Sequence, residues 1–477
     1  MSTGTPVLDV AFVATALGGR LRSRAGRASD AIRFTGAAID SRAVREGDLF
    51  VALPGERVDG HDFAAAAVRA GASGCLLSRL VEGTQGAALF LVDDTLASLQ
   101  HLGAAWRSVL TDTQVIGITG SVGKTTTKAI VAAVLAARYR VQANPLNYNN
   151  EVSVPLCLLE LRPETERAVI EHGMYTTGEI ALLCRWTRPR IGIVLNVGPT
   201  HLERAWSMDA ITRAKRELIE ALPADGAAVL NADDERVRSM APHTAARVWW
   251  FGSSEDAQVR GGDVTPQGAH GFDFTLTAQG ESRRVHVPLP GRHLLSNVLA
   301  AAATAFADGL TFDEVAAAIE ALDVPLRLNV IEMPGGITVL DDTYNAQPAS
   351  TLAALDLLDE MAGRHVALLG DMRELGEVSR AEHERVGRRA AAVVAILVTI
   401  GDEARPLGEA ARGAGLADVV HVASRAEAVA TLRARIAPGD VVLVKGSHAL
   451  GLKDVVADLA RDHRTPDQHA PDPGGAR

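Results

Sequence analysis

The segment from Gln114 to Thr127, QVIGITGSVGKTTT, constrains the fold of this chain more than any other. Its β-branched start predicts a buried parallel strand, two glycines interrupt it, and an alanine-rich helix follows from about Thr125 to Ala137. A strand, a glycine loop and a helix that opens with Lys and Thr are the layout of a phosphate-binding loop. Lys124 would reach the β- and γ-phosphate oxygens, and the Thr125 hydroxyl could bind magnesium.

The loop departs from the general phosphate-loop pattern, since Ile118 stands where the first glycine of that pattern would be. The variant here is TGxxGKTT, which begins at Thr119. A chance glycine turn between a strand and a helix is the competing interpretation. The Lys–Thr pair on the first turn of an otherwise apolar helix argues against it, so we predict a nucleotide phosphate site.

Length and composition limit the classes of protein to consider. The 477 residues are too many for one hydrophobic core, so two to four domains are expected. Aromatic residues make up only 4%, which suits helices packed on parallel sheets better than a β-sandwich, and the net charge of −10 argues against general nucleic-acid binding. Three cysteines without metal-ligand spacing, and no signal peptide or membrane span, predict a protein of the reduced cytoplasm.

Residues 1–110 form the first expected domain. A short helix at Val7–Leu17 and strands at Phe34–Ile39, Asp48–Leu53, Cys75–Leu77 and Ala88–Val92 are predicted. Polar residues cluster on its turns, but solvated turns explain them as well as ligand contacts do. No catalytic-triad geometry is expected, so this segment alone does not indicate a function.

Residues 111–322 form the second expected domain, in which three strands after the phosphate loop lead into polar residues. Ligands of open α/β sheets bind beyond the carboxyl ends of the strands, so Glu171, His201 and Asn231 are expected beside the loop. A carboxylate and a neutral imidazole there could hold a second divalent ion. A solvated glutamate and a core histidine are the alternatives for each residue alone. Residues 255–290 are predicted to form a small β insertion.

Residues 323–464 repeat the α/β alternation and predict a smaller doubly wound domain. Its expected strands are Thr338–Leu340, Val366–Leu369, Ala395–Ile400, Val419–Val422 and Val441–Val444. The Pro-, Asp- and Gly-rich residues 465–477 are expected to be a disordered tail.

With these segments assembled, the sequence resembles the Mur ligases, the ATP-dependent amide-forming enzymes of peptidoglycan precursor synthesis. The resemblance runs from about Phe34 to Val456. The segments that carry it, besides the loop, are IDSRAVREGDLFVALPGERVDGHDF, NNE before Val154, EHGMYTTGEI, NVGPTHLE, AKRELIEAL, NADD, DDTYNAQPAS, LGDMRELG and LVKGSHAL. The DDTYNA and LGDMRELG segments point to the branch of the family that adds D-alanyl-D-alanine, and the DNPR motif of the diaminopimelate-adding relative is absent.

Four positions depart from the family pattern. Leu294 replaces Asn, Ser153 replaces Gly, Gln347 replaces Asn and His448 replaces Arg. The last two changes bear on the dipeptide contacts more than on the reaction.

The resemblance implies an α/β fold of three domains: a small α/β UDP-binding domain, a central P-loop parallel-sheet ATPase domain and a C-terminal Rossmann-like doubly wound domain. It also implies ATP and Mg²⁺ as cofactors, with UDP-N-acetylmuramoyl-tripeptide and D-alanyl-D-alanine as substrates of a cytoplasmic, monomeric ligase that forms an acyl phosphate. Nucleic acid and membranes are not expected as partners.

The same resemblance assigns roles to individual residues. The implied ATP contacts are Gly120, Ser121, Val122, Gly123, Lys124, Thr125, Thr126, Asn297, Arg327, Asp341 and Asp342. The implied metal ligands are Thr125, Glu171, His201 and a carbamylated Lys215, and the implied catalytic groups are Lys124, His201 and Lys215. The implied UDP contacts are Asp40, Ser41 and Arg42, and the implied dipeptide contacts are Tyr344, Asn345, Lys445 and His448.

Lys215 also has an ordinary interpretation, a solvated lysine on an amphipathic helix. A charge argument opposes it, because a free ammonium about 4 Å from another positive charge costs roughly 4 kcal/mol at an effective dielectric of 20. A carbamate would instead be anionic and offer two oxygens to a metal.

Two other functions remain open from the sequence. One is a related ATP-dependent ligase of the folylpolyglutamate synthase type, against which the DSR and DGHDF turns of the first domain argue. The other is a nucleotide-binding scaffold without catalysis, against which Lys124, Thr125, Glu171, His201 and Lys215 argue.

Overall fold

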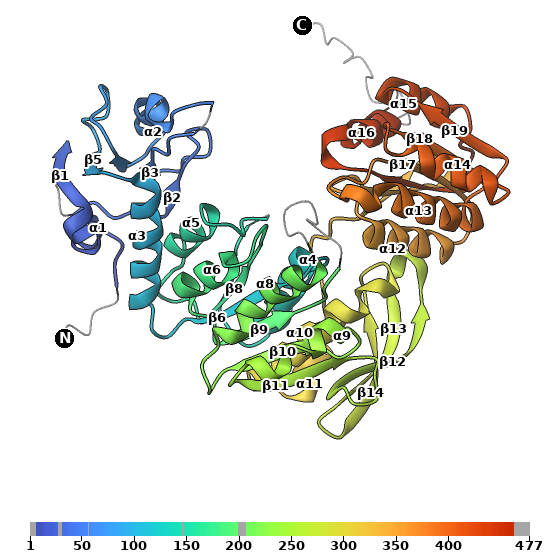
Figure 1. Ribbon diagram of the computed structural model, residues 1–477, viewed down its shortest axis with the longest axis horizontal. Coiled ribbons are helices and arrows are strands. Elements are labelled where there is room, and N and C mark those ends of the chain that lie inside the picture. Colours follow the sequence, from blue (N-terminus) through green and yellow to red (C-terminus); the bar gives the residue numbers. More distant parts are fainter. Residues whose placement is uncertain (1–5, 27–30, 56, 146, 199–206, 462–477) are drawn as a thin grey trace, which may run out of the picture.

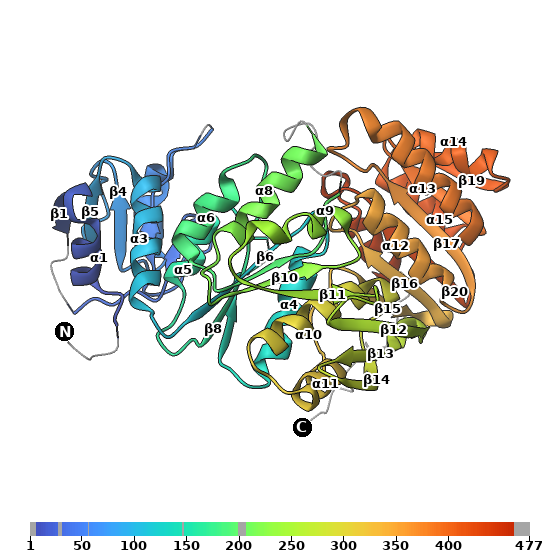
Figure 2. The same cartoon turned by 60° about the horizontal axis from the view of Figure 1, so that its bottom comes forward.

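The computed structural model describes residues 6–26, 31–55, 57–145, 147–198 and 207–461. Three separate β-sheets follow one another along the chain, and helices flank each of them (Figure 1). The first and third sheets lie at opposite ends of the molecule with the second between them, as both Figure 1 and Figure 2 show. A three-domain α/β architecture was predicted from the sequence, and the structure confirms it.

The first sheet has the strand order β1-β5-β4-β3-β2. Its strands are β1 (Leu21–Gly26), β2 (Ala37–Ala38), β3 (Leu49–Val51), β4 (Gly74–Leu77) and β5 (Ala88–Val92). Helices α1 (Val10–Leu17) and α3 (Thr95–Val109) cover one face, and α2 (Ala64–Arg69) packs against the other. The prediction missed β1, an antiparallel edge strand, because its sequence LRSRAG is mostly polar and exposed.

The central sheet has the order β14-β13-β12-β11-β10-β9-β6-β8-β7. Its strands are β6 (Gln114–Thr119), β7 (Val141–Ala143), β8 (Arg167–Glu171), β9 (Ile191–Val194), β10 (Ala227–Asn231), β11 (Arg247–Gly252), β12 (Val259–Pro266), β13 (Phe272–Ala278) and β14 (Glu281–Val287). The short strands predicted within residues 255–290 are present as β12, β13 and β14. Strand β12 pairs with β11, so β12, β13 and β14 extend the main sheet.

Helices cover both faces of the central sheet. Helices α4 (Lys124–Ala136), α10 (Leu295–Ala307) and α11 (Phe312–Glu320) pack on one face, and their apolar side chains form one core with the sheet. On the opposite face lie α5 (Ser153–Leu159), α6 (Glu179–Thr187) and α8 (Met208–Glu220).

The third sheet has the order β15-β16-β20-β17-β18-β19 and is doubly wound, as predicted. Its strands are β15 (Asn329–Met333), β16 (Ile337–Asp342), β17 (Arg364–Gly370), β18 (Ile396–Ile400), β19 (Asp418–Val422) and β20 (Asp440–Lys445). Helices α12 (Pro348–Asp359), α13 (Ser379–Val393) and α14 (Arg405–Gly413) cover one face, and α15 (Arg425–Arg433) and α16 (Lys453–Arg461) cover the other. The prediction missed β15, the antiparallel edge strand.

The first two sheets are joined more closely than the last two. Helix α3 buries Leu99, Leu102 and Trp106 in a core that also contains Leu156 of α5 and Leu183 of α6. The two cores of the third sheet contain only residues from 328 onward. A continuous apolar core therefore links the first and central parts of the chain.

Among the described residues, no helix combines the length and the apolar character needed to cross a membrane.

Candidate active site

The phosphate loop forms at the carboxyl end of β6, which lies between the parallel strands β9 and β8 of the central sheet. Gly123 precedes α4 with a φ of 85°, and a Cβ there would lie 2.7 Å from the Asn297 side-chain nitrogen. Glycine is therefore required both for the left-handed backbone and for the close approach of α10. Asn297 reinforces the junction by donating to the Thr127 hydroxyl at 2.7 Å.

Lys124 is the first residue of α4, and its ammonium lies against the loop itself. Its Nζ donates to the carbonyl oxygens of Gly120 at 2.7 Å and Ser121 at 3.3 Å. Burial lowers the pKa of Lys124, and the nearby Glu171 opposes that shift. A cation held over the loop in this way is placed to neutralise a phosphate.

Thr125 and Glu171 form the oxygen-rich part of the site. The Thr125 hydroxyl donates to Glu171 Oε2 at 2.9 Å, and Asn149 donates to Oε1 at 2.8 Å. Glu171 ends β8 and is 1% exposed, so this carboxylate is buried with both oxygens engaged by neutral donors. The prediction that β8 would deliver Glu171 to the phosphate loop is confirmed.

Lys215 lies in α8 and is not a solvated lysine. It is 2% exposed and lines a pocket of about 70 Å³ together with Gly120 and Lys124. Burial, with a smaller contribution from the positive charge of Lys124, holds the pKa of Lys215 well below its usual range. His201, the third predicted metal ligand of this region, lies outside the described residues.

The third sheet presents a second set of polar residues. Lys445, at the end of β20, donates to Asp342 Oδ2 at 2.6 Å and to the Asn345 carbonyl at 2.8 Å. Burial raises the pKa of Asp342, while Lys445 acts in the opposite direction. Adjacent parallel strands β16 and β20 therefore place a buried ion pair where both end.

Arg327 connects the two sets. Its guanidinium donates to the Thr125 hydroxyl at 2.7 Å and lies over the Tyr344 ring, 4.3 Å from the ring centroid. The Tyr344 and His448 rings are 6.1 Å apart. A continuous chain of contacts thus runs from the phosphate loop to the third domain.

One cavity of about 1020 Å³ lies between these two sets of residues. From the central domain it is lined by Ser121, Val122, Gly123, Lys124, Thr125, Thr126, Glu171 and Asn297, among others. From the linker and third domain it is lined by Arg327, Asp342, Tyr344, Asn345, Lys445, Ser447 and His448, among others. The structure therefore brings most of the predicted ATP and dipeptide residues to one cavity, although they are up to about three hundred residues apart in sequence.

Several predicted residues lie elsewhere. Asp341 turns onto its own loop and accepts from the Thr343 hydroxyl at 2.7 Å, and it does not line the cavity. Asn231 donates to the Leu195 carbonyl at 2.8 Å, which ties β10 to the end of β9. Asn231 therefore stabilises the ends of these two strands, because its side chain is already hydrogen-bonded to the backbone.

The expected UDP contacts lie on an exposed turn of the first domain. Arg42 donates to both Asp40 carboxylate oxygens, and this pairing lowers the pKa of Asp40 to about 2. Ser41 sits between them on the same turn. These three residues are not part of the cavity beside the phosphate loop.

Sequence reasoning did not single out Asn196 or Asn149. Asn196 Oδ1 accepts from the Val122 backbone at 2.9 Å, and its Nδ2 donates to the Val122 carbonyl at 3.1 Å. This side chain holds the phosphate loop from the adjacent strand end. The position of Asn196 at the carboxyl end of a predicted strand was the available signal.

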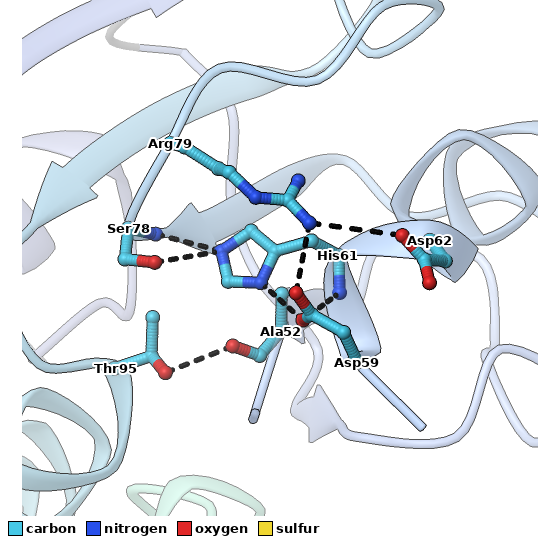
Figure 3. A network of polar contacts seen from close by, with 7 residues as sticks. All are labelled: Ala52, Asp59, His61, Asp62, Ser78, Arg79 and Thr95. Atoms are coloured by element: carbon cyan, nitrogen blue, oxygen red, sulfur yellow. Dashed lines mark hydrogen bonds and ion pairs between the residues drawn. The ribbon is translucent and has the colours of Figure 1, made fainter. Parts of the chain in front are cut away.

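The first domain contains a polar network that the sequence analysis did not predict (Figure 3). His61, 2% exposed, contacts Asp59 through Nδ1 at 2.7 Å and Ser78 through Nε2. The contacts run in the order Asp–His–Ser, as in a hydrolase triad. However, the Ser78 backbone N–H donates to the same Nε2 at 2.9 Å, so its lone pair is not available to activate the hydroxyl. The network instead fixes the turn before α2 against the end of β4.

Comparison with known proteins identifies the family of this chain. Three family descriptions match: Mur ligase family, catalytic domain, at residues 33–81; Mur ligase middle domain at 118–305; and Mur ligase, glutamate ligase domain, at 326–448. A protein of Mycobacterium tuberculosis (strain CDC 1551 / Oshkosh) is 39% identical, with 95% of this chain and 98% of that protein covered. The chain belongs to the Mur ligase family.

Other members of the Mur ligase family support the assignment. A protein of Escherichia coli (strain K12) is 37% identical over 88% of this chain and 92% of its own length. MurF from Acinetobacter baumannii has the same fold, with a TM-score of 0.84, 29% identity, and coverage of 96% of this chain and 99% of that chain. MurF ligase from Thermotoga maritima, solved in complex with ADP, has a TM-score of 0.78 at 30% identity, with 90% and 97% covered.

Proposed function

We propose that this chain is the ATP-dependent ligase that joins D-alanyl-D-alanine to UDP-N-acetylmuramoyl-tripeptide in peptidoglycan precursor synthesis. The M. tuberculosis and E. coli relatives both carry the name UDP-N-acetylmuramoyl-tripeptide–D-alanyl-D-alanine ligase. The single observation that carries the proposal is the cavity in which the phosphate loop faces Tyr344, Asn345 and Lys445. It is large enough for a nucleotide together with a reacting acyl group.

The reaction has two steps. A carboxylate oxygen of the tripeptide attacks the γ-phosphorus of ATP, a C–O–P bond forms, and the bond to the β-phosphate oxygen breaks to release ADP. The amine of D-alanyl-D-alanine then attacks the acyl carbon, a C–N bond forms, and inorganic phosphate leaves as the amine loses a proton. Phosphoryl transfer depends mainly on positioning and charge neutralisation, which Lys124 and the backbone N–H groups at the start of α4 would provide.

The residues beside the loop fit a magnesium ion. The Thr125 hydroxyl and the Glu171 carboxylate are 2.9 Å apart, and hydroxyl and carboxylate oxygens are ligands of the kind Mg²⁺ prefers. Among the described residues, no three His, Cys, Asp or Glu side chains are arranged so that they could hold a metal ion, and the ion proposed here would take further ligands from the substrate phosphates. When bound, Mg²⁺ would neutralise charge on the β- and γ-phosphate oxygens.

We further propose that Lys215 is carbamylated and, with Glu171 and His201, would hold a second Mg²⁺. Two observations support this. The amine is buried beside Lys124, and burial together with that neighbouring charge lowers its pKa well below the usual range, which favours the neutral, nucleophilic form. A neutral amine can take up carbon dioxide, whereas an ammonium cannot.

The remaining substrates are assigned to the outer domains. Residues 1–110 would hold the UDP moiety through Asp40, Ser41 and Arg42, residues 111–322 would bind ATP, and residues 323–464 would supply the dipeptide contacts. Tyr344, Asn345, Lys445 and His448 all line the cavity, which supports the last assignment. Asn297, Arg327 and Asp342 line it as well and remain proposed ATP contacts. We propose a cytoplasmic monomer.

The folylpolyglutamate synthase alternative is weaker. A solved folylpolyglutamate synthase from M. tuberculosis is similar at a TM-score of 0.57 and 17% identity, which indicates a common fold only.

The direct test is phosphate release from ATP by the purified protein with UDP-N-acetylmuramoyl-tripeptide and D-alanyl-D-alanine, with the product identified by mass. We expect product to require both substrates, and L-alanyl-L-alanine serves as the matched control. Product formation with glutamate instead of the dipeptide would favour the folylpolyglutamate type. No substrate-dependent phosphate release would favour a non-catalytic scaffold.

A further inference from the structure

Glu171, the carboxylate beside the phosphate loop, is held by two asparagines of one segment. The Asn144 side-chain oxygen accepts from the Glu171 backbone N–H at 3.0 Å, and the Asn149 amide donates to Glu171 Oε1 at 2.8 Å. Both asparagines belong to the polar run NPLNYNNE, which follows β7 in the sequence. The position of the Glu171 carboxylate therefore depends on how these asparagines are held.

Strand β7 by itself supports them weakly. It has only three residues, Val141–Ala143, and it is the outermost strand of the central sheet. It therefore pairs with β8 on one side only, and this pairing ends where Ala143 lies opposite Val169. Asn144 is the first residue beyond it, so another part of the chain has to fix its position.

The hydrogen bonds of Asn144 depart from those of a regular parallel strand. In a parallel pair, one residue bonds through its N–H and its carbonyl to two residues of the neighbouring strand that are two positions apart. The Asn144 N–H follows this pattern and donates to the Val169 carbonyl at 3.3 Å. The Glu171 N–H should then donate to the Asn144 carbonyl, but it donates to the Asn144 side chain instead. The main-chain carbonyl of Asn144 is thereby left for a different donor.

That donor is Lys128 of α4. Its Nζ donates to the Asn144 carbonyl at 2.6 Å, and both residues are 5% exposed, so water has little access to this hydrogen bond. A charged donor makes such a bond stronger than one between two neutral groups. Lys128 follows Thr125 by three residues and lies on the same face of α4. The helix that carries Thr125 is therefore fastened to the segment that holds Glu171.

Lys128 is also close enough to Glu171 for their charges to interact. Burial lowers the pKa of Lys128, and the negative charge of Glu171 opposes that shift. Lys124 lines both cavities described above, whereas Lys128 lines neither. Lys128 therefore acts on the site through the residues that it holds.

We propose that Lys128 is a positioning residue for the magnesium site, because its bond to the Asn144 carbonyl keeps the Asn144 side chain on the Glu171 N–H and Asn149 on the Glu171 carboxylate. The inference rests on the proposed function, in which Thr125 and Glu171 bind Mg²⁺. Without Lys128, the buried Asn144 carbonyl would lose its donor and would turn toward the Glu171 N–H, as in a regular strand. That rotation displaces the Asn144 side chain and the segment that carries Asn149.

The test measures metal binding itself, on the purified full-length protein with ADP and Mn²⁺, an ion that suits the same oxygen ligands and is paramagnetic. Water-proton relaxation reports Mn²⁺ on the protein, and a titration without protein gives the background from Mn²⁺ and ADP. Lys128→Met keeps the length of the side chain and removes the donor. Its Kd for Mn²⁺ should rise about 10–100-fold, as is typical when a group that orients a metal ligand is lost. Lys128→Arg retains a charged donor and should stay near the wild-type Kd.

The form of the titration separates positioning from a loss of folded protein. Partial unfolding lowers the number of Mn²⁺ sites and leaves the Kd of the folded fraction unchanged. Lys453→Met, at an exposed lysine of α16, is the matched control for the exchange of lysine for methionine. Thermal unfolding shows which variants are folded. If Lys128→Met does not fold, Lys128→Gln, whose amide is shorter and uncharged, and Asn144→Ala should each show the rise in Kd.

A double variant tests the route of the effect. Lys128→Met and Asn144→Ala break the same connection to Glu171, so the double variant should bind Mn²⁺ no more weakly than the weaker single variant. Additive effects would overturn the route through Asn144. An unchanged Kd in folded Lys128→Met or Lys128→Gln, or a loss in folded Lys128→Arg as large as that in Lys128→Met, would overturn the role of Lys128.

The glutamate variant separates this inference from the proposed function. Glu171→Gln should weaken Mn²⁺ binding, because the amide keeps the shape of the side chain and removes its negative charge. Wild-type Mn²⁺ affinity in Glu171→Gln would overturn the proposed magnesium site. Binding that depends on Glu171 but does not change in the Lys128 variants would overturn only the positioning role.

Discussion

Replacing Lys445 by methionine tests how much the buried ion pair of Lys445 and Asp342 contributes to the stability of the third domain. The Lys445 side chain is 2% exposed and that of Asp342 13%, and their charged atoms are 2.6 Å apart. Lys445→Met keeps the length of the side chain and leaves the Asp342 carboxylate without its cation. Removing one partner of a buried ion pair costs about 3–5 kcal/mol, because the remaining charge stays buried and unpaired.

The cost should depend on pH in a defined direction. Burial already raises the pKa of Asp342 in the folded protein, and Lys445 opposes that shift, so losing Lys445 raises the pKa further. A carboxyl whose folded pKa lies above its unfolded value favours folding when it is protonated. Stability of the variant should therefore be greatest at low pH and be lost as the pH rises through the folded pKa.

Hydrogen exchange is the appropriate assay, because the five tryptophans at 106, 186, 206, 249 and 250 all lie outside residues 323–464. Amides of β16 and β20 should exchange roughly a hundredfold to several thousandfold faster in Lys445→Met at neutral pH, where each 1.4 kcal/mol is a factor of ten. The double variant Lys445→Met/Asp342→Asn should recover most of the protection. Equal loss at pH 5 and pH 8, or no recovery in the double variant, would refute the reasoning.

Three further substitutions test the site. Lys124→Ala should lower kcat by roughly 10²–10³-fold with unchanged thermal unfolding, because Nζ contacts only loop carbonyls among the described residues; near-wild-type ATP turnover with tripeptide present would contradict the phosphate-loop assignment. Lys215→Ala should abolish turnover and regain part of it when short-chain carboxylic acids supply the missing oxygens; full activity without them would remove Lys215 from the site. His448→Arg should lower the dipeptide KM, because a guanidinium is permanently charged and can bind a carboxylate with two hydrogen bonds; an unchanged dipeptide KM would exclude His448 as a dipeptide contact.

Local sequence was enough to predict the elements that carry most of the chemistry. The TGxxGKTT pattern predicted strand β6, the glycine loop and the start of α4, because strand, glycine and helix preferences are set by neighbouring residues. The rule that parallel strands expose ligand residues at their carboxyl ends placed Glu171 beside Thr125 correctly. The doubly wound third sheet was predicted from the alternation of strands and helices in residues 323–464.

The sequence was insufficient to predict strands whose pairing partners lie in distant parts of the chain. Strands β1 and β15 are polar or irregular edge strands, so they lack the apolar pattern that identifies a buried strand. The alternation within residues 255–290 predicts antiparallel strands, and β12, β13 and β14 confirm it. Only the pairing of β12 with β11 shows that they continue the central sheet.

What the sequence by itself determined about this protein is therefore the phosphate loop, the α/β class and the family, since each depends on residues close together in the chain. Tertiary structure alone decided which residues share a site. In the folded chain, Asp341 accepts a hydrogen bond from the Thr343 hydroxyl, and Asn231 donates one to the Leu195 carbonyl. Lys215 is buried, and this burial lowers the pKa of its amine. Burial and hydrogen-bond partners come from segments up to hundreds of residues apart, and a side chain's charge and availability depend on those partners.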